Sequence, residues 1–239
     1  MSALSNREHL SDRKQEVGWL EDILKTEFFA VIKKSCGESV EKYWLTGVLP
    51  AFCHGISPLS ATQLISFEEQ YNSLCGFTEM DVEAIIKRTL SEDEQRLAMS
   101  DIKSWYSGYR FSHSIGSKPI TGMFNPQQVF VYLQKMISGS LERPHRGEGN
   151  SVQSATVLSV MGEPGIVTFH HLMDLLYSKK TTNVLTELSY RELMQKWSED
   201  KTYYLLFYLG ILTFDKDFGY LSVPNRCMHQ LVSPKVSCF

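Results

Sequence analysis

Side chains that could serve as a nucleophile or as metal ligands are few in this chain. Cys53 and His54 are adjacent and follow a predicted buried strand, where a thiol–imidazole pair could catalyse hydrolysis, although the sequence offers no third group for a triad. The alternative is that Cys53 is a buried thiol that packs as a small apolar side chain. No His-Glu-x-x-His motif occurs, and the adjacent His170 and His171 would point about 100 degrees apart on a helix, so they do not form a ligand pair.

The sequence also lacks the usual phosphate-binding loops. A P-loop surrounds phosphates with backbone N–H groups from a glycine-rich turn and with a lysine that precedes Ser or Thr. This chain contains no Gly-Lys dipeptide and no G-x-G-x-x-G. Residues 199–201 (EDK) match the E-x-K of a nuclease core, but they lie in a polar turn before a predicted helix, and we interpret them as a helix cap. We therefore expect no self-sufficient ATPase site.

Residues 105–111 (WYSGYRF) place four aromatic side chains, one glycine and one arginine within a short segment. Such a cluster could stack on bases or form cation–π contacts through Arg110. The alternative is structural: the rings anchor the end of a helix in the core, Gly108 forms the turn, and Arg110 belongs to a hydrogen-bond network. The sequence leaves both interpretations open.

The composition is that of an ordinary globular protein. The 239 residues are 43% hydrophobic and 21% charged, which argues against disorder and allows one large domain or two small ones. The formal net charge is −3, so the chain has no electrostatic footprint for nucleic acid, and nonspecific DNA binding gains no support from charge.

Cysteine spacing and hydropathy favour a cytoplasmic or nuclear protein. The five cysteines are odd in number and none forms a C-x-x-C pair, which favours reduced thiols over a disulfide framework or a zinc site. Residues 1–14 are polar and lack the apolar segment of a signal peptide. The longest apolar candidate, residues 203–214, is shorter than the ~20 residues of a membrane-spanning helix, so no membrane association is expected.

Apolar periodicity and capping residues predict the first elements. Residues 17–34 have apolar side chains at helical spacing, and residues 43–49 (YWLTGVL) form a short apolar run typical of a strand buried in a parallel sheet. Helix starts are marked by Thr78 with Asp81, by Ser91 with Glu94, and by Asn125 followed by Pro126. The first helix is expected to bury Leu20, Leu24, Phe28, Val31 and Ile32. The helix after Asn125 is expected to bury Val129, Phe130, Leu133, Met136 and Ile137.

The second half begins with a polar segment, residues 138–154, that we predict to be a linker or a mobile loop because it is rich in Ser, Gly and charge. Helices are then predicted at residues 169–177, 190–197 and 201–209, and strands at residues 181–188, 211–214 and 220–223. Gly210 ends the last helix, and residues 215–219 form the turn between the last two strands. A helix followed by a hairpin is the shape of a winged helix.

Several segments, in this order, resemble the AAA-ATPase-like family, a P-loop group common in fungi and bacteria. The resemblance extends from about residue 21 to residue 229, which is nearly the whole chain. The matching segments are residues 28–33 (FFAVIK), 44–50 (WLTGVLP), 74–82 (LCGFTEMDV), 105–111 (WYSGYRF), 124–126 (FNP), 205–214 (LLFYLGILTF) and 223–225 (VPN). Each segment is short, and their shared order carries the resemblance.

The resemblance implies an α-rich α/β fold, in which a partial P-loop ATPase core is followed by a helical lid with a winged-helix-like C-terminal hairpin. The implied division is a core remnant at 1–70, a lid region at 71–137, the linker at 138–154 and a winged-helix-like region at 155–239. In that family the P-loop and the acidic Walker B strand lie upstream of the matched segments, and an optional PD-(D/E)xK nuclease-like domain lies downstream. The chain thus resembles a C-terminal portion: a fragment, a truncated gene product or a degenerate member.

A complete member of the family is implied to bind ATP and Mg²⁺. By resemblance, Thr46 would sit at the strand tip that senses the γ-phosphate, and Arg110 would contribute a cation near the nucleotide. Neither group can transfer a phosphoryl group without the P-loop lysine and a positioned Mg²⁺. The implied function is a nucleotide-sensing lid and interaction region that binds the missing ATPase core or another protein partner, without hydrolysis of its own.

Two other functions compete with this one. The first is a stand-alone winged-helix module for protein or nucleic acid, although residues 203–227 carry only Lys216 and Arg226 as cations, which disfavours DNA. The second is a hydrolase that uses Cys53 and His54 and therefore requires a reactive thiolate. Because the run 43–49 suits burial on both faces, we also expect uncovered apolar surface near Thr46, and with it dye binding or self-association.

Overall fold

The computed structural model describes residues 19, 22–47, 49–50, 62–112, 122–139, 174, 177, 180–181, 188, 192, 198–217 and 219–236. The chain divides into two compact units. The first consists of Met1–Gln63 with Thr186–Trp197, and the second of Leu64–Leu185 with Ser198–Phe239. Helices predominate among the described residues and the strands form small antiparallel sheets, in agreement with the predicted α-rich α/β class.

In the first unit a π-helical segment, η1 (Leu24–Phe29), runs directly into α2 (Ala30–Ser35). A π-helix joins residue i to residue i+5, so Leu24 shares a face with Phe29 rather than with Phe28. Phe29 is therefore buried, whereas Phe28 and Val31 are 53% and 57% exposed. The side chains packed around Phe29 are Leu24, Ile32, Tyr43 and Leu45. The predicted helix is confirmed over its described residues, but the burial predicted for Phe28 and Val31 is wrong.

The buried strand predicted at residues 43–49 is not formed in the described residues. Residues 43–47 and 49 belong to no helix or strand, Thr46 is exposed, and Trp44 is 60% exposed. A central strand of a parallel sheet needs a hydrogen-bonded neighbour on each side. The described residues of the first unit contain no strand that could pair with this segment. The late strand of a P-loop core is thus missing from the part described, while the exposed Trp44 agrees with the apolar surface expected near Thr46.

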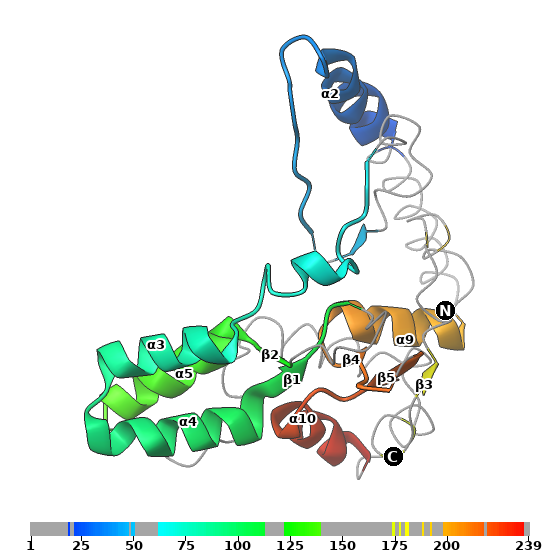
Figure 1. Cartoon of the computed structure of the whole chain (residues 1–239). Coiled ribbons are helices and arrows are strands. Elements are labelled where there is room, and N and C mark those ends of the chain that lie inside the picture. The colour runs from blue at the N-terminus through cyan, green and yellow to red at the C-terminus, as the bar shows by residue number, and fades with distance from the viewer. Residues whose placement is uncertain are drawn as a thin grey trace, which may run out of the picture. The chain divides into compact units, whose positions relative to one another are not determined.

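Three helices of the second unit, α3 (Glu79–Thr89), α4 (Glu92–Tyr106) and α5 (Pro126–Ile137), pack together (Figure 1). Each begins where the capping residues predicted. Before α3, the Asp81 N–H donates to Thr78 Oγ1 at 3.2 Å and the Thr78 N–H donates to Asp81 Oδ2 at 2.8 Å. Before α5, the Gln127 N–H donates to Asn125 Oδ1 at 2.9 Å. These local hydrogen bonds fix where the helices begin.

Two small antiparallel sheets complete the second unit. In one, β1 (Ser107–Tyr109) pairs with β2 (Met123–Phe124); in the other, β5 (Tyr220–Ser222) lies between β3 (Lys180–Thr181) and β4 (Thr213–Phe214). The hairpin predicted near the C-terminal end is confirmed, with Phe214 opposite Leu221. A helix, α9 (Glu199–Tyr208), precedes this hairpin, and α10 (Arg226–Val236) follows it. A short 3₁₀ turn, η4 (Glu69–Tyr71), precedes α3.

The core of the second unit combines apolar side chains from β2, β4, β5 and each of the α-helices described there, which are α3, α4, α5, α9 and α10. Its largest fully buried side chains are Tyr203, Tyr204, Phe214, Ile86, Ile102, Leu206, Ile211, Leu221, Met228, Gln128 and Val82. Six of the ten residues of α9 are buried, and they come from more than one side of the helix. Consequently α9 is a core element rather than a surface helix.

Several predicted features lie outside the described residues. They are residues 140–154 of the predicted linker, most of the helices predicted at 169–177 and 190–197, residues 182–187 of the predicted strand, and the side chains of Cys53, His54, His170 and His171. The division into 1–70, 71–137, 138–154 and 155–239 stays a prediction. No helix in the described part of the chain is both long enough and apolar enough to cross a membrane.

Candidate functional site

Five of the seven segments that carry the family resemblance meet in the second unit, around a contact between Gly108 and Pro224. Gly108 has φ +125°, and a Cβ atom on it would lie 2.1 Å from the carbonyl oxygen of Pro224. Only glycine allows two backbones to approach so closely at this φ. The region, here called the junction, comprises residues 72–77, 105–112, 122–125, 210–214 and 223–225.

A second close approach brings the segment before α3 against β2. A Cβ atom on Gly76 would lie 2.9 Å from Met123 Cβ. The neighbouring residue Phe77 pairs with Phe124: the Phe77 N–H donates to Phe124 O at 3.0 Å and the Phe124 N–H donates to Phe77 O at 2.9 Å. The starts of α3 and α5 are therefore held on the same short strand.

The backbone of Arg110 is fixed by residues of the C-terminal hairpin. The Arg110 N–H donates to Thr213 Oγ1 at 2.7 Å, and the Thr213 hydroxyl donates to Arg110 O, also at 2.7 Å. The Phe214 N–H donates to the same carbonyl at 3.3 Å. Within its own segment, Arg110 Nη1 donates to Gly108 O at 3.3 Å. Arg110 is thus held, half-buried, between β1 and β4.

Asn72 holds the two residues that follow Arg110. Its side-chain oxygen accepts hydrogen bonds from the Phe111 N–H at 2.8 Å, from the Ser112 N–H at 3.2 Å and from the Ser112 hydroxyl at 3.3 Å. Asn72 and Ser112 are both buried. A buried amide oxygen that accepts several hydrogen bonds imposes one backbone course on the chain, so residues 109–112 are restrained from two sides.

Tyr109 and Asn225 connect the junction to α10. The Tyr109 hydroxyl donates to Gly210 O at 3.2 Å. Asn225 Nδ2 donates to Tyr106 O at 3.4 Å, while Asn225 Oδ1 accepts from the Met228 N–H at 3.0 Å and so caps α10. Burial is the main cause that raises the pKa of the Tyr109 phenol well above its ordinary value.

Gln128 and Cys227 form a buried polar pair beside Tyr109. Each side chain is 1% exposed, and Gln128 Nε2 donates to Cys227 Sγ at 3.6 Å. Gln128 Oε1 has no hydrogen-bond partner among the described residues. A buried thiol packs as a small apolar group and is poorly placed to react. We therefore assign this pair to the packing of α5 against α10.

The structural interpretation of residues 105–111 is confirmed for the aromatic rings and for Arg110. Tyr106 and Tyr109 are 2% and 4% exposed, and Arg110 belongs to a hydrogen-bond network. Gly108, predicted to form a turn, instead lies inside β1 at positive φ, where the pairing with β2 is irregular. Tyr109 and Phe111 stack on each other with their ring centres 6.1 Å apart. Because Tyr106 and Tyr109 are buried, neither ring presents a free face on which a base could stack.

Thr46 and Arg110, the two residues expected to contact nucleotide, lie in different units, and their pairing stays a prediction. A metal-bound nucleotide requires oxygen ligands for the metal and N–H donors for the phosphates. Among the described residues no group of three or more His, Cys, Asp and Glu side chains gathers to hold a metal ion. The junction provides one cation, Arg110.

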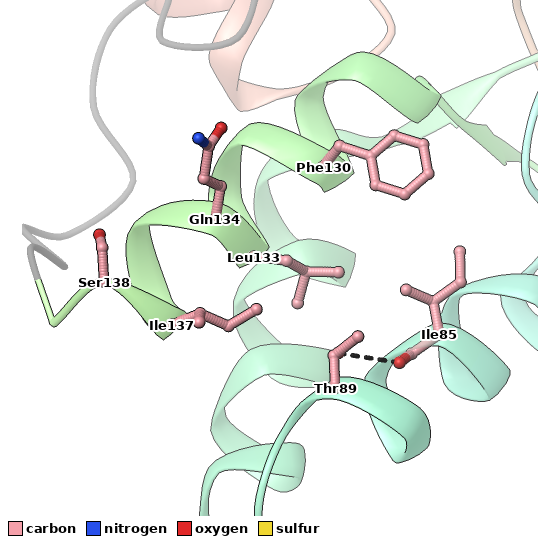
Figure 2. Close-up of a pocket in the computed structure, with 7 residues that line it drawn as sticks. All are labelled: Ile85, Thr89, Phe130, Leu133, Gln134, Ile137 and Ser138. Carbon is pink, nitrogen blue, oxygen red and sulfur yellow. Dashed lines mark hydrogen bonds between the residues drawn. The ribbon is translucent and has the colours of Figure 1, made fainter.

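An open apolar groove between α3 and α5 is the feature that sequence reasoning missed. It has a volume of about 470 Å³. Figure 2 shows its lining residues, which are Ile85, Thr89, Phe130, Leu133, Gln134, Ile137 and Ser138. Phe130 and Ile137 are 53% and 61% exposed, so their predicted burial is wrong. The apolar residues of α5 extend around more of the helix than its neighbours cover. The breadth of this apolar face was the signal in the sequence that part of it would stay exposed.

Comparisons with known proteins yield one weak similarity. No protein-family model matches the chain, and no solved structure matches it. A curated protein of Azotobacter chroococcum mcd 1, described as an uncharacterized protein in the vnfD 5′ region, is 29% identical over 94 residues. The matched stretch is 36% of this chain and 16% of that protein. The match thus spans about one sixth of the relative's length, and it assigns no family or activity.

Proposed function

We propose that this chain is the lid and interaction portion of an AAA-ATPase-like protein. It binds an ATPase core, or another protein partner, and responds to the nucleotide held there without hydrolysing ATP itself. The proposal rests on the family resemblance, and one structural observation supports it: five of the resembling segments, spread over residues 74–225, pack against one another in the junction. If the five segments resembled the family by chance, nothing would require them to lie together in the fold.

Arg110 is the residue through which the junction would sense a nucleotide. Its main chain is held by Thr213 and Phe214, and the next two residues are held by Asn72. A cation carried on so restrained a backbone keeps its position and so contributes to binding with little loss of entropy. Phosphates bound by a neighbouring core would supply the negative charge that it meets.

The winged-helix alternative gains little from the structure. In such a module the helix before the hairpin reads the nucleic acid from the surface. Here α9 occupies that place in the chain order and contributes Tyr203, Tyr204 and Leu206 to the core. The packing of α9 therefore leaves it little surface for base recognition.

Complementation tests the proposal directly. An AAA-ATPase-like protein with an intact P-loop would be truncated to remove the segments that correspond to residues 74–225, and phosphate release would be measured with and without this chain. We expect the truncated enzyme to be slow, this chain alone to release no phosphate from Mg-ATP, and the mixture to recover activity. No gain over the truncated enzyme at saturating concentrations would overturn the proposal.

Arg110→Ala and Arg226→Ala form the matched pair of variants. Arg226 is an exposed arginine on α10 that donates to Ser104 Oγ at 3.2 Å, outside the Arg110 network. We expect Arg110→Ala to lower the recovered activity at least about tenfold, as removal of a cation at a phosphate does, and Arg226→Ala to leave it nearly unchanged. A thermal shift of this chain with Mg-ATP, lost in Thr46→Ala or Arg110→Ala, would instead reveal a nucleotide site of its own.

A further inference from the structure

The groove between α3 and α5 presents apolar side chains to solvent although α4 packs against both helices. Figure 2 shows Phe130 and Ile137 projecting from one wall and Ile85 from the other. On α5, Phe130 and Ile137 are seven residues apart, which is about two helical turns, so they form a single stripe with Gln134 between them. We propose that this groove is the surface through which two copies of the chain associate.

The charges beside the groove favour a second copy over an unrelated helix. Asp81 and Arg88 are exposed and lie on the same flank of α3 as Ile85, because positions 81, 85 and 88 fall within one side of the helix. They are also seven residues apart. When two α3 helices meet antiparallel about a two-fold axis near Ala84 and Ile85, each Asp81 faces the Arg88 of the other copy. One surface thus supplies both members of two ion pairs.

The apolar stripe obeys the same symmetry. Two copies that meet groove to groove bring together α3 and α5 of each, which makes a four-helix contact with Ile85, Leu133, Phe130 and Ile137 in its centre. Gln134, the polar residue between Phe130 and Ile137, is uncharged, so it brings no charge into this contact. Isologous interfaces of this kind need only one self-complementary patch.

Sedimentation velocity over a range of protein concentrations measures the association. We expect a monomer–dimer equilibrium that Ile137→Glu weakens at least about tenfold, because it places a charge in the apolar centre. Leu97→Glu is the matched control: Leu97 is 52% exposed on α4 and does not line the groove. Circular dichroism of both variants confirms that they fold. A purely monomeric wild-type chain at the highest concentration would overturn the proposal.

The charge arrangement is tested separately. Arg88→Glu should weaken the dimer because the new carboxylate faces Asp81 of the other copy, and Lys87→Glu, the same charge change on the far side of α3, should have little effect. Ala84→Cys in a background that replaces Cys36, Cys53, Cys75 and Cys238 by Ser should give a disulfide-linked dimer under mild oxidation, and the background alone, which keeps only the buried Cys227, should not. Equal effects of the two charge variants, or no dimer from Ala84→Cys, would exclude this antiparallel arrangement.

Discussion

The Thr213 hydroxyl hydrogen-bonds both backbone groups of Arg110, at 2.7 Å to the N–H and 2.7 Å to the carbonyl oxygen. One buried side chain thus replaces a rung of sheet pairing and joins β4 to the end of β1. Both partners lie in segments that carry the family resemblance. The contact makes Thr213 a positioning residue for the arginine that we propose as a nucleotide-sensing cation.

Thr213→Val removes this hydroxyl with almost no change of shape. We expect it to lower the free energy of unfolding by about 1–3 kcal/mol, because the half-buried Arg110 N–H loses its acceptor. Thr213→Ser keeps the hydroxyl and should cost about 1 kcal/mol or less, for the lost methyl group. Urea denaturation followed by circular dichroism measures both. A loss in Thr213→Val that is no larger than the loss in Thr213→Ser would contradict the role assigned to the hydroxyl.

Gly108→Ala should destabilise the second unit severely. The substitution combines a left-handed φ of +125° with a Cβ only 2.1 Å from Pro224 O, so we expect a loss above about 3 kcal/mol of unfolding free energy or a failure to fold. Gly219→Ala separates the two causes, since Gly219 has φ +85° and nothing within 4 Å of its Cβ position. It should cost only about 1 kcal/mol. Comparable melting temperatures for the two variants would contradict the close approach.

Three tyrosines should resist ionisation while the chain is folded. Burial raises the pKa of Tyr109, Tyr132 and Tyr203, and the last two also donate to the carboxylates of Asp101 and Asp174. A raised folded pKa means that the stability these groups contribute is complete below the unfolded value of about 10 and is lost as the pH rises above it.

Absorbance at 295 nm, recorded during an alkaline titration, tests this behaviour. The three buried tyrosines should ionise only when the chain unfolds, so their part of the absorbance change should appear together with unfolding. Tyr109→Phe should therefore leave the reversible part of the curve unchanged. A smaller reversible amplitude in that variant would show that Tyr109 is open to solvent.

Acid should weaken the starts of α3 and α4. Hydrogen bonds from the Thr78 side chain and backbone lower the pKa of Asp81, and those from Ser91 lower the pKa of Glu94. Because both folded pKa values are lowered, this stabilisation is present above the ordinary carboxyl range near pH 4 and is lost as the pH falls through the folded values. In the double variant Asp81→Asn, Glu94→Gln, the urea midpoint should fall less between pH 5 and pH 3 than it does in the wild type. An unchanged acid dependence would assign it to other carboxylates.

Helix starts were predictable because their signals are local. Thr78, Ser91 and Asn125 each cap the helix that the sequence placed after them. The hairpin near residues 213–222 was predictable for the same reason, since a glycine and a polar turn separate two apolar runs. In each case the residues that decide the structure lie within a few positions of one another.

Features that depend on distant residues were not predictable. The buried face of the first helix shifted from Phe28 to Phe29 because a π-helical turn changed the period. Thr213 gave no sign in the sequence that it would bind Arg110, since nothing near either residue encodes the other. The exposed stripe of α5 was mistaken for core because an apolar pattern does not state how much of it a neighbour covers. The contact of Thr46 with nucleotide stays a prediction.

The span of the junction in sequence also sets when this unit can fold. The hydrogen bond between Arg110 and Thr213 cannot form until 103 further residues have been synthesised, and the one between Tyr106 and Asn225 needs 119. A ribosome adds about 5–20 residues per second, so α3, α4 and α5 would emerge several seconds before the hairpin that closes their core. During that interval the apolar sides of these helices stay uncovered, so the nascent chain exposes the kind of surface that chaperones bind and that the finished fold buries.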